Sequence, residues 1–121
     1  MATSVFVVHT NPVEGREDEY NTWYTERHLK DVVAIPGFVR ARRYHRSDAQ
    51  FAPLPGFRYL AIYEIEGDPA EAMRALRRAL KSGLEVSEAM ASEVYATVYE
   101  PITDWVTAEA EVAATDERLR D

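Results

Sequence analysis

The sequence contains no cysteine, which excludes disulfides, thiolate metal ligands and cysteine nucleophiles together. Basic residues are in the minority: 14 lysines and arginines stand against 21 aspartates and glutamates, giving a formal net charge of −7. A chain this acidic has no general attraction for a phosphate backbone. The composition therefore predicts that no nucleic acid is a partner.

Long apolar runs are missing as well. No stretch approaches the roughly 20 residues that a membrane-spanning helix needs, and residues 1–4 lack the basic start of a secretory signal. The sequence thus predicts no membrane partner and a cytoplasmic location. It also has no Walker loop, GxGxxG or GxSxG motif, so nothing in it favours nucleotide binding or serine hydrolysis.

At 121 residues the chain has the length of one domain. We expect the domain to cover residues 1–101 and to be followed by an acidic, alanine-rich tail, 102–121, that forms a marginal helix. The expected strands are 4–10, 38–46, 57–65 and 94–100. The expected helices are 14–30 and 69–82, with an irregular turn out to Gly37 and a short helical turn within 84–92.

Two short sequences set the helix ends. Pro36-Gly37 stops the first helix, because proline disfavours helical geometry in the residue before it. Asp68-Pro69 starts the second, since aspartate is a good N-cap and proline fits the first turn. The order strand, helix, strand, strand, helix, strand is typical of the ferredoxin-like α+β fold, a four-stranded antiparallel sheet with two helices on one face.

The other face of such a sheet has no helix to cover it. Alternation along strand 57–65 predicts that this bare face carries an aromatic and aliphatic set: Tyr59, Ala61, Tyr63 and Ile65, with Tyr95 and Tyr99 from the last strand. So large an aromatic surface should not face water alone. We therefore expect a two-fold homodimer, sheet against sheet, with an aromatic-lined cavity for a small-molecule ligand.

Two motifs carry a resemblance to a known family. The first is Asn21-x-Trp23-Tyr24-x-x-x-His28-x-x-Asp31-Val32-x-x-x-Pro36-Gly37-Phe38, and the second is Arg58-Tyr59-Leu60-Ala61-Ile62-Tyr63-Glu64. Together they resemble the EthD-like branch of the dimeric α/β-barrel superfamily, over about residues 4–101. The resemblance implies fold and branch but no single reaction. Superfamily members isomerise muconolactones, cyclise polyketides, oxygenate to quinones without a cofactor, or use haem.

His28 is the first candidate catalytic residue. It is expected near the C-terminal end of the first helix, where the helix dipole favours the protonated imidazole. Asp31, three residues on, would orient it or hold its charge. The family motif contains both residues. The alternative is a structural histidine bonded to Asp31 or to a backbone carbonyl.

Tyrosine hydroxyls are the second group of candidates, because a phenol in a dry cavity can stabilise an enolate oxygen. Tyr63 is the expected catalytic donor, with Tyr59 beside it. The expected substrate-binding residues are His9, Trp23, Tyr24, Tyr59 and Tyr95. The alternative for each tyrosine is core packing, for Trp23 helix-to-sheet packing, and for His9 a half-exposed position before a turn.

The histidines and the basic run give no strong indication of a metal, cofactor or anion site. The three histidines are far apart and show no metal-binding spacing, so we expect no metal site. We expect no cofactor. The spacing of the histidines does not exclude a haem, however, because a haem needs only one axial histidine. The basic run Arg40–Arg46 is interpreted as a solvated edge strand, with attraction for a carboxylated or phosphorylated ligand as the alternative.

Three functions remain. The first is a cofactor-independent acid/base enzyme of the isomerase, cyclase or lyase type, acting on a small, largely apolar, oxygenated substrate that is aromatic or polyketide-like. The second is a monooxygenase of the same superfamily, cofactor-free or haem-dependent. The third is a non-catalytic binding or interaction module in which the tail around Trp105 docks on a partner.

Overall fold

The computed structural model describes residues 3–52 and 56–108. The strands are β1 (Ser4–Thr10), β2 (Phe38–His45), β3 (Tyr59–Ile65) and β4 (Tyr95–Tyr99). The helical elements are α1 (Glu17–Trp23), the π-helical turn η1 (Tyr24–His28), α2 (Leu29–Val33) and α3 (Pro69–Lys81). Their order along the chain is the one predicted, and each strand lies within two residues of its predicted bounds.

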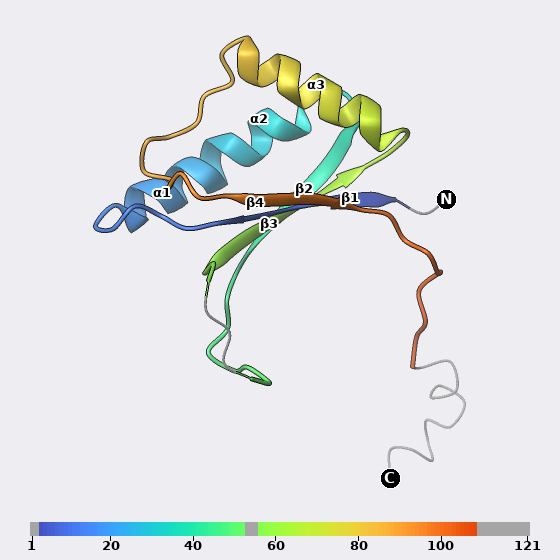
Figure 1. Ribbon diagram of the computed structural model, residues 1–121, viewed down its shortest axis with the longest axis horizontal. Coiled ribbons are helices and arrows are strands. Elements are labelled where there is room, and N and C mark those ends of the chain that lie inside the picture. The colour runs from blue at the N-terminus through green and yellow to red at the C-terminus, as the bar shows by residue number, and fades with distance from the viewer. Residues whose placement is uncertain (1–2, 53–55, 109–121) are drawn as a thin grey trace.

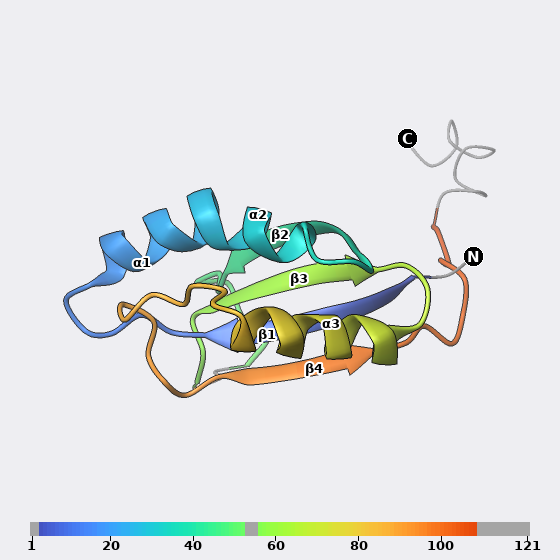
Figure 2. The same ribbon diagram turned by 90° about the horizontal axis from the view of Figure 1, so that it is seen from above.

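All four strands form one antiparallel sheet in the order β2-β3-β1-β4. The first helix and α3 lie side by side over a single face of it (Figures 1 and 2). We call this the covered face; within the described residues no helix lies on the opposite, open face (Figure 1). The ferredoxin-like α+β fold is thereby confirmed.

The first helix runs without interruption from Glu17 to Val33 and contains one π-helical turn, η1. Acidic residues occupy its first turn, where the helix dipole favours negative charge. The helix begins later and ends later than the predicted 14–30. His28 therefore lies inside the helix and not near its C-terminal end, and the π-helical turn was not predicted.

The second helix, α3, matches its prediction closely. The Asp68 carboxylate accepts a hydrogen bond from the backbone N–H of Ala70 at 2.9 Å, with Pro69 in the first turn. Gly83 follows the C-cap with a φ of +107°, the left-handed conformation that commonly ends a helix. Ala72 and Ala75 are the α3 residues buried against the sheet.

The segment before β4 forms turns and not the short helix predicted within 84–92. Its backbone bonds run to the segment that precedes α1: Val13 N–H donates to the Ala89 carbonyl at 2.7 Å, and Ala91 N–H to the Asn11 carbonyl at 2.9 Å. Strand-like pairing with this segment therefore replaces the intrahelical bonds. In the tail, residues 102–108 are exposed and form no helix, which corrects that prediction for them; 109–121 lie outside the described residues.

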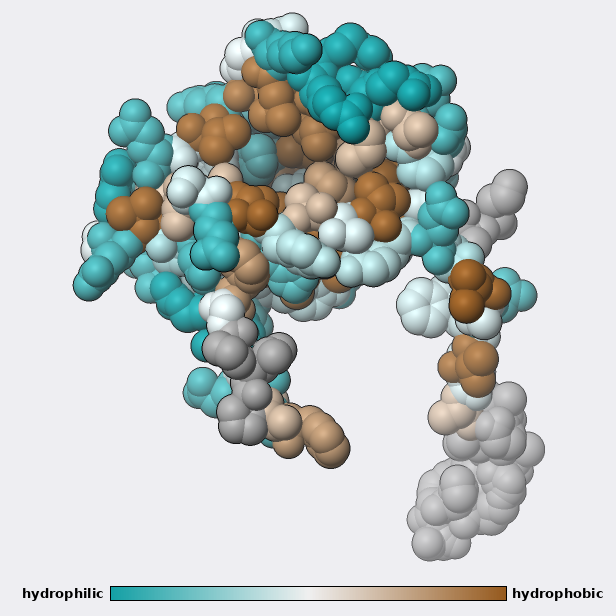
Figure 3. Space-filling model, in the orientation of Figure 1, coloured by the Kyte–Doolittle hydropathy of each residue, from teal (hydrophilic) through white to brown (hydrophobic). Residues whose placement is uncertain are grey.

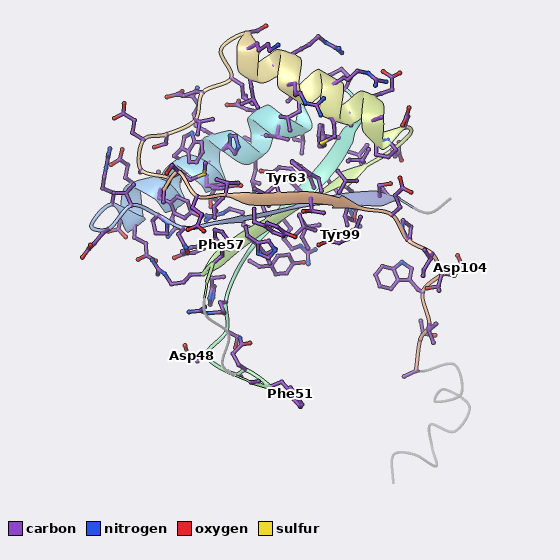
Figure 4. The ribbon with its side chains drawn as sticks, in the orientation of Figure 1. Asp48, Phe51, Phe57, Tyr63, Tyr99 and Asp104 are labelled. Atoms are coloured by element: carbon purple, nitrogen blue, oxygen red, sulfur yellow. The ribbon has the colours of Figure 1, made fainter. Side chains whose placement is uncertain are left out.

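The register of β3 corrects the predicted composition of the open face. Phe6 pairs with Tyr63 and Val8 with Ala61, and all four side chains are buried on the covered face. Tyr59 and Ile65 share that face by alternation. The prediction failed because β3 is apolar on both sides, so alternation alone could not tell which side meets the helices. Figure 4 shows Tyr63 pointing towards the helices and Tyr99 towards the open face.

The open face is nonetheless largely apolar. Tyr95 and Tyr99 are about half exposed, at 54% and 51%. By register, the other strands contribute the following side chains to this face: Val5, Val7 and His9 from β1, Leu60, Ile62 and Glu64 from β3, and Arg40, Arg42 and Tyr44 from β2. None of the described helices is long and apolar enough to cross a membrane.

Gly37 fixes the close approach of the turn before β2 to α3. Its φ is +101°, and a Cβ at this position would lie 3.1 Å from the Cβ of Ala72. We expect Gly37→Ala to lower the free energy of unfolding by about 1–2 kcal/mol through backbone strain, with a further loss from the contact. The control is Gly67→Ala, with a φ of +87° and nothing within 4 Å. Urea unfolding should show the larger loss at Gly37; equal losses would contradict the packing argument.

Candidate active site

Aromatic rings fill the space between the first helix and the sheet. Tyr20 and Tyr24 are almost completely buried, and their rings meet edge to face at 5.7 Å between centroids. From the sheet, Tyr63 packs against Phe6 at 5.9 Å and Phe38 at 6.1 Å. This aromatic layer is the interior of the covered face, and three of the predicted site residues on the first helix, Trp23, Tyr24 and His28, contact one another in it.

His28 belongs to this layer. Its ring stacks on Trp23 with 4.6 Å between centroids and meets the edge of Tyr24 at 5.0 Å. The Nδ1 atom is buried and has no hydrogen-bond partner. All three residues lie in or next to the π-helical turn, a feature frequently found at functional sites.

The charge state of His28 is the reverse of the predicted one. Burial lowers its pKa to about 4, and the nearby Asp31 carboxylate offsets only part of this effect. The predicted dipole effect fails because the helix continues to Val33, so His28 is not at its end. The imidazole is therefore neutral at physiological pH.

Asp31 is not in contact with His28. Its carboxylate lies 4.0 Å from the Nε of Arg27, and Arg27 in turn pairs with Glu85 at 3.0 Å. No hydrogen bond joins Asp31 to the imidazole in the described residues. No hydrogen bond therefore supports the predicted role of Asp31 in orienting the imidazole. Asp31 acts on His28 through its charge.

Tyr63 and Tyr24 form a pair of phenols inside the layer. The Tyr63 hydroxyl donates to the Tyr24 hydroxyl at 3.4 Å. Burial raises the pKa of Tyr24 to about 12 and raises the pKa of Tyr63 well above its usual range. Both phenols are therefore neutral hydrogen-bond donors, and through Tyr24 they reach the same group of rings as His28.

Arg43 is the residue of this site that the sequence interpretation missed. Its guanidinium carbon lies 4.5 Å from the ring centroid of Tyr24 and 5.2 Å from those of Tyr20 and Tyr59. Nη1 donates to the Thr25 hydroxyl at 2.9 Å, whereas Nη2 is buried without a partner. The signal was present in the strand alternation, which puts Arg43 on the same side as Ala41, but the basic run around it favoured a solvated strand.

The buried side-chain nitrogens that lack a partner all surround Tyr24. In the described residues these are Trp23 Nε1, His28 Nδ1 and Arg43 Nη2. The ring centroid of Tyr24 lies 5.1 Å from that of Trp23 and 5.0 Å from that of His28. The guanidinium carbon of Arg43 lies 4.5 Å from the same centroid. A buried polar atom without a partner costs about 1–3 kcal/mol, so pairing any of these three nitrogens with a water molecule or with a polar group of a ligand would stabilise the protein.

Tyr59 is held by a separate polar group at the edge of the layer. Its hydroxyl donates to the Glu17 carboxylate and accepts from Asn21 Nδ2 at 3.2 Å. Arg58 pairs with the same carboxylate at 3.1 Å, and the hydrogen bond from Tyr59 does most to hold the pKa of Glu17 below its usual range. The Tyr59 proton is thus already committed, which does not favour the predicted oxyanion role.

His9 and Tyr95 lie elsewhere, on the open face. The His9 ring is 5.7 Å from the rings of both Phe57 and Tyr95. These residues line a half-open pocket of about 350 Å³ together with Arg58 and Tyr59. The structure therefore brings together His28, Trp23, Tyr24 and Tyr63, leaves Tyr59 at their edge, and separates His9 and Tyr95 from them.

No group of histidines, aspartates and glutamates in the described residues has the geometry to hold a metal ion.

Comparison with known proteins finds no matching family model and no matching curated relative. Among solved structures, the haem-degrader MhuD from Mycobacterium tuberculosis, with two haems bound in its active site, is 18% identical with a TM-score of 0.59, covering 85% of this chain and 99% of that chain. An MhuD mutant with two manganese protoporphyrin IX bound per active site is 16% identical with a TM-score of 0.60, covering 86% and 99%. A monooxygenase from Streptomyces coelicolor, ActVA-Orf6, in complex with nanaomycin D, is 22% identical with a TM-score of 0.48, covering 88% and 94%.

The likeness to MhuD shows that this chain shares the fold of that protein.

The burial of His28 makes stability depend on pH. Between about pH 6.5 and pH 4 the unfolded chain binds a proton at His28 that the folded chain does not. The free energy of unfolding should therefore fall by about 3 kcal/mol as the pH drops through this window. Several carboxylates also change the free energy of unfolding in this pH range. The measurement is therefore the difference in free energy of unfolding between wild type and His28→Gln, obtained from urea unfolding at each pH. That difference should shrink towards pH 4, and a difference that is the same at every pH would contradict the burial argument.

Proposed function

We propose that this protein is a member of the EthD-like branch that moves a proton on a small, largely apolar, oxygenated ligand, without a cofactor and with His28 as the base. The observation that carries the proposal is the neutral imidazole of His28, enclosed by Trp23 and Tyr24 with its Nδ1 unpaired. An imidazole used only for packing would satisfy that nitrogen. The ligand class is aromatic or polyketide-like, because rings make up the surroundings of His28.

The proposed reaction begins at a carbon next to a carbonyl group. The electron pair of a His28 nitrogen takes the proton from that carbon, and the electrons of the broken C–H bond move to the carbonyl oxygen as an enolate. The low pKa keeps His28 unprotonated at neutral pH but also makes it a weaker base in the free protein. The enolate formed in the same step offsets this, because its negative charge stabilises the imidazolium. Trp23, whose Nε1 has no acceptor, and the neutral Tyr24 phenol are the donors whose rings contact His28, and Tyr63 donates to Tyr24 behind them.

The fate of the enolate decides the reaction type. Return of the proton to another carbon gives an isomerase, and attack of the enolate carbon on a second carbonyl of the same molecule gives a cyclase. Expulsion of a leaving group gives a lyase. None of these needs an oxidant or a metal, because no net electrons are gained or lost.

A haem fits this arrangement poorly. Neutral imidazole is the form that binds iron, so His28 has the chemistry of an axial ligand. Its ring is stacked on Trp23 and edged by Tyr24, and Nδ1 is buried, so Nε2 is the nitrogen left to bind iron. A haem is a far larger group than the substrate of the proposed proton transfer and would need more room between these rings. No step above uses a haem.

The proton-transfer proposal is tested by isotope exchange. Purified protein is incubated in D₂O with a panel of aryl ketones and β-diketones, and deuterium uptake at the acidic carbon is followed by NMR. We expect wild type to accelerate uptake and His28→Gln to lose at least about 100-fold, the usual size of general base catalysis. The control, Asp31→Asn, should lose much less, since Asp31 contacts Arg27 and not His28.

Other outcomes of the same preparation decide between the alternatives. Full exchange by His28→Gln would refute the role of His28. Oxygen uptake with phenolic substrates in an oxygen electrode would favour the cofactor-free monooxygenase. A Soret band would favour the haem-dependent one, and ligand binding without exchange would favour the non-catalytic module.

We also propose that the open face is covered by a second copy of this chain. The face is apolar at β1, β3 and β4, and a monomer would leave this area in water. The β2–β3 loop and the C-terminal segment both project on the open side of the sheet (Figure 1). Each bears bulky apolar side chains that are more than nine-tenths exposed, Phe51 on the loop and Ile102 and Trp105 on the segment, where apolar residues stand away from the body of the molecule (Figure 3). A two-fold partner would cover the face and these projections together.

Native mass spectrometry tests this assembly. Wild type should have the mass of two chains, and Tyr99→Glu, which places a charge on the open face beside Val5, should have the mass of one. Leu80→Glu is the matched control, because Leu80 is also half exposed but lies on α3, over the covered face. A single chain in wild type, or a dimer lost equally in the control, would contradict the proposed interface.

A further inference from the structure

We propose that Arg43 is the specificity-determining residue of the covered face and binds an ionised oxygen of the ligand, so that the ligand is a planar, apolar molecule bearing a carboxylate. The inference rests on the site of the proposed function but not on its proton transfer. It adds a residue and a charge to what His28 implies about the ligand.

The first reason is that Arg43 has no counter-ion. Arg16, Arg40 and Arg58 each pair with a glutamate at 2.8, 2.8 and 3.1 Å. Arg43 has no carboxylate within 4.0 Å in the described residues, although acids outnumber bases in this chain. It lies among the rings of Tyr20, Tyr24 and Tyr59 instead. The rings attract the cation and hold its position, but they do not neutralise its charge.

The second reason is the unpaired nitrogen. Nη1 of Arg43 donates to Thr25. The guanidinium also acts on the Tyr20 hydroxyl: burial raises the pKa of Tyr20, and the hydrogen bond and the charge of Arg43 offset part of that rise. Nη2 is nevertheless buried with no acceptor in hydrogen-bond geometry. Leaving a charged donor buried and unpaired is costlier than leaving a neutral one. An ionised oxygen removes that cost, because it accepts the N–H and neutralises the charge in one contact.

The third reason is the character of the neighbouring groups. Trp23 Nε1 is a donor that lacks an acceptor, and the Tyr24 phenol is neutral and accepts from Tyr63, so its own proton is free to donate. Among the described residues, no hydrogen bond or ion pair joins a carboxylate to Tyr24, Tyr63 or Arg43, so donors prevail among these groups. A ligand that matches this set presents acceptor oxygens, while the rings favour a flat apolar body.

Arg43 can also be reached from outside. Its side chain is partly exposed, and its bond to Thr25 lies near the surface. It stands on β2, an edge strand of the sheet. The guanidinium thus lies where the aromatic layer meets solvent, with one nitrogen turned inward.

The test compares an acid with its uncharged amide. Binding of 2-naphthoate and 2-naphthamide to the full chain is measured by NMR titration. Wild type should prefer the acid by at least about tenfold, the effect expected of one hydrogen bond to a charged group. Arg43→Gln should remove the preference while still binding the amide, and Arg43→Lys should restore part of it.

Arg42→Gln is the matched control. Arg42 is the neighbouring residue of the same strand, but it lies on the open face, against Tyr44. It should keep the preference for the acid. Equal binding of acid and amide by wild type, an equal loss in both variants, or no binding of either probe would overturn the proposal.

Two further measurements keep the test decisive. If Arg43→Gln fails to fold, the side-chain Nε–H signal of Arg43 in wild type should shift with 2-naphthoate and not with 2-naphthamide; an unmoved signal refutes the contact. His28→Gln should keep the acid preference. If His28→Gln loses deuterium exchange but still prefers the acid, both proposals are supported. If wild type prefers the acid but shows no deuterium exchange, the proton-transfer proposal alone is refuted.

Discussion

The burial of the aromatic side chains of the first helix against the sheet is the contact on which both the fold and the site depend. Tyr20 and Tyr24 have almost no exposed surface, and Tyr63 meets Tyr24 from the sheet. Aromatic side chains contribute more buried area than any others and dominate the energetics of a core this size. The same rings enclose an imidazole and contact a guanidinium, so packing and chemistry use one set of atoms.

The fold was largely predictable because local signals agreed with one another. Asp68-Pro69 began α3 as expected, and Pro36-Gly37 lay in the turn after the first helix. The face of β3 was not predictable, since Ala61 and Tyr63 on one side resemble Leu60 and Ile62 on the other. Only the pairing with β1 decided which side met the helices. Strand alternation gives two faces but does not say which one is covered.

The sequence predicted several residues of the site but not the charge state of His28. The sequence analysis named Trp23, Tyr24 and His28 as site candidates, and the structure brings their rings into contact. Burial, and with it the neutral state of His28, comes from the sheet, which no local pattern contains. Arg43 was not predicted as a site residue, because it belongs to a basic run that was interpreted as a solvated strand. Its contacts with three tyrosine rings, which distinguish it from Arg42, appear only in the folded structure.

The π-helical turn at residues 24–28 holds one residue more than an α-helical turn, because its hydrogen bonds run from i to i+5. Deleting one residue within it would leave an α-helical turn, so Val32 and Ile35 beyond it would still face the core. The contacts of Trp23, Tyr24 and His28 with one another would change instead. The helix can therefore lose a residue here at the expense of the site and not of the fold.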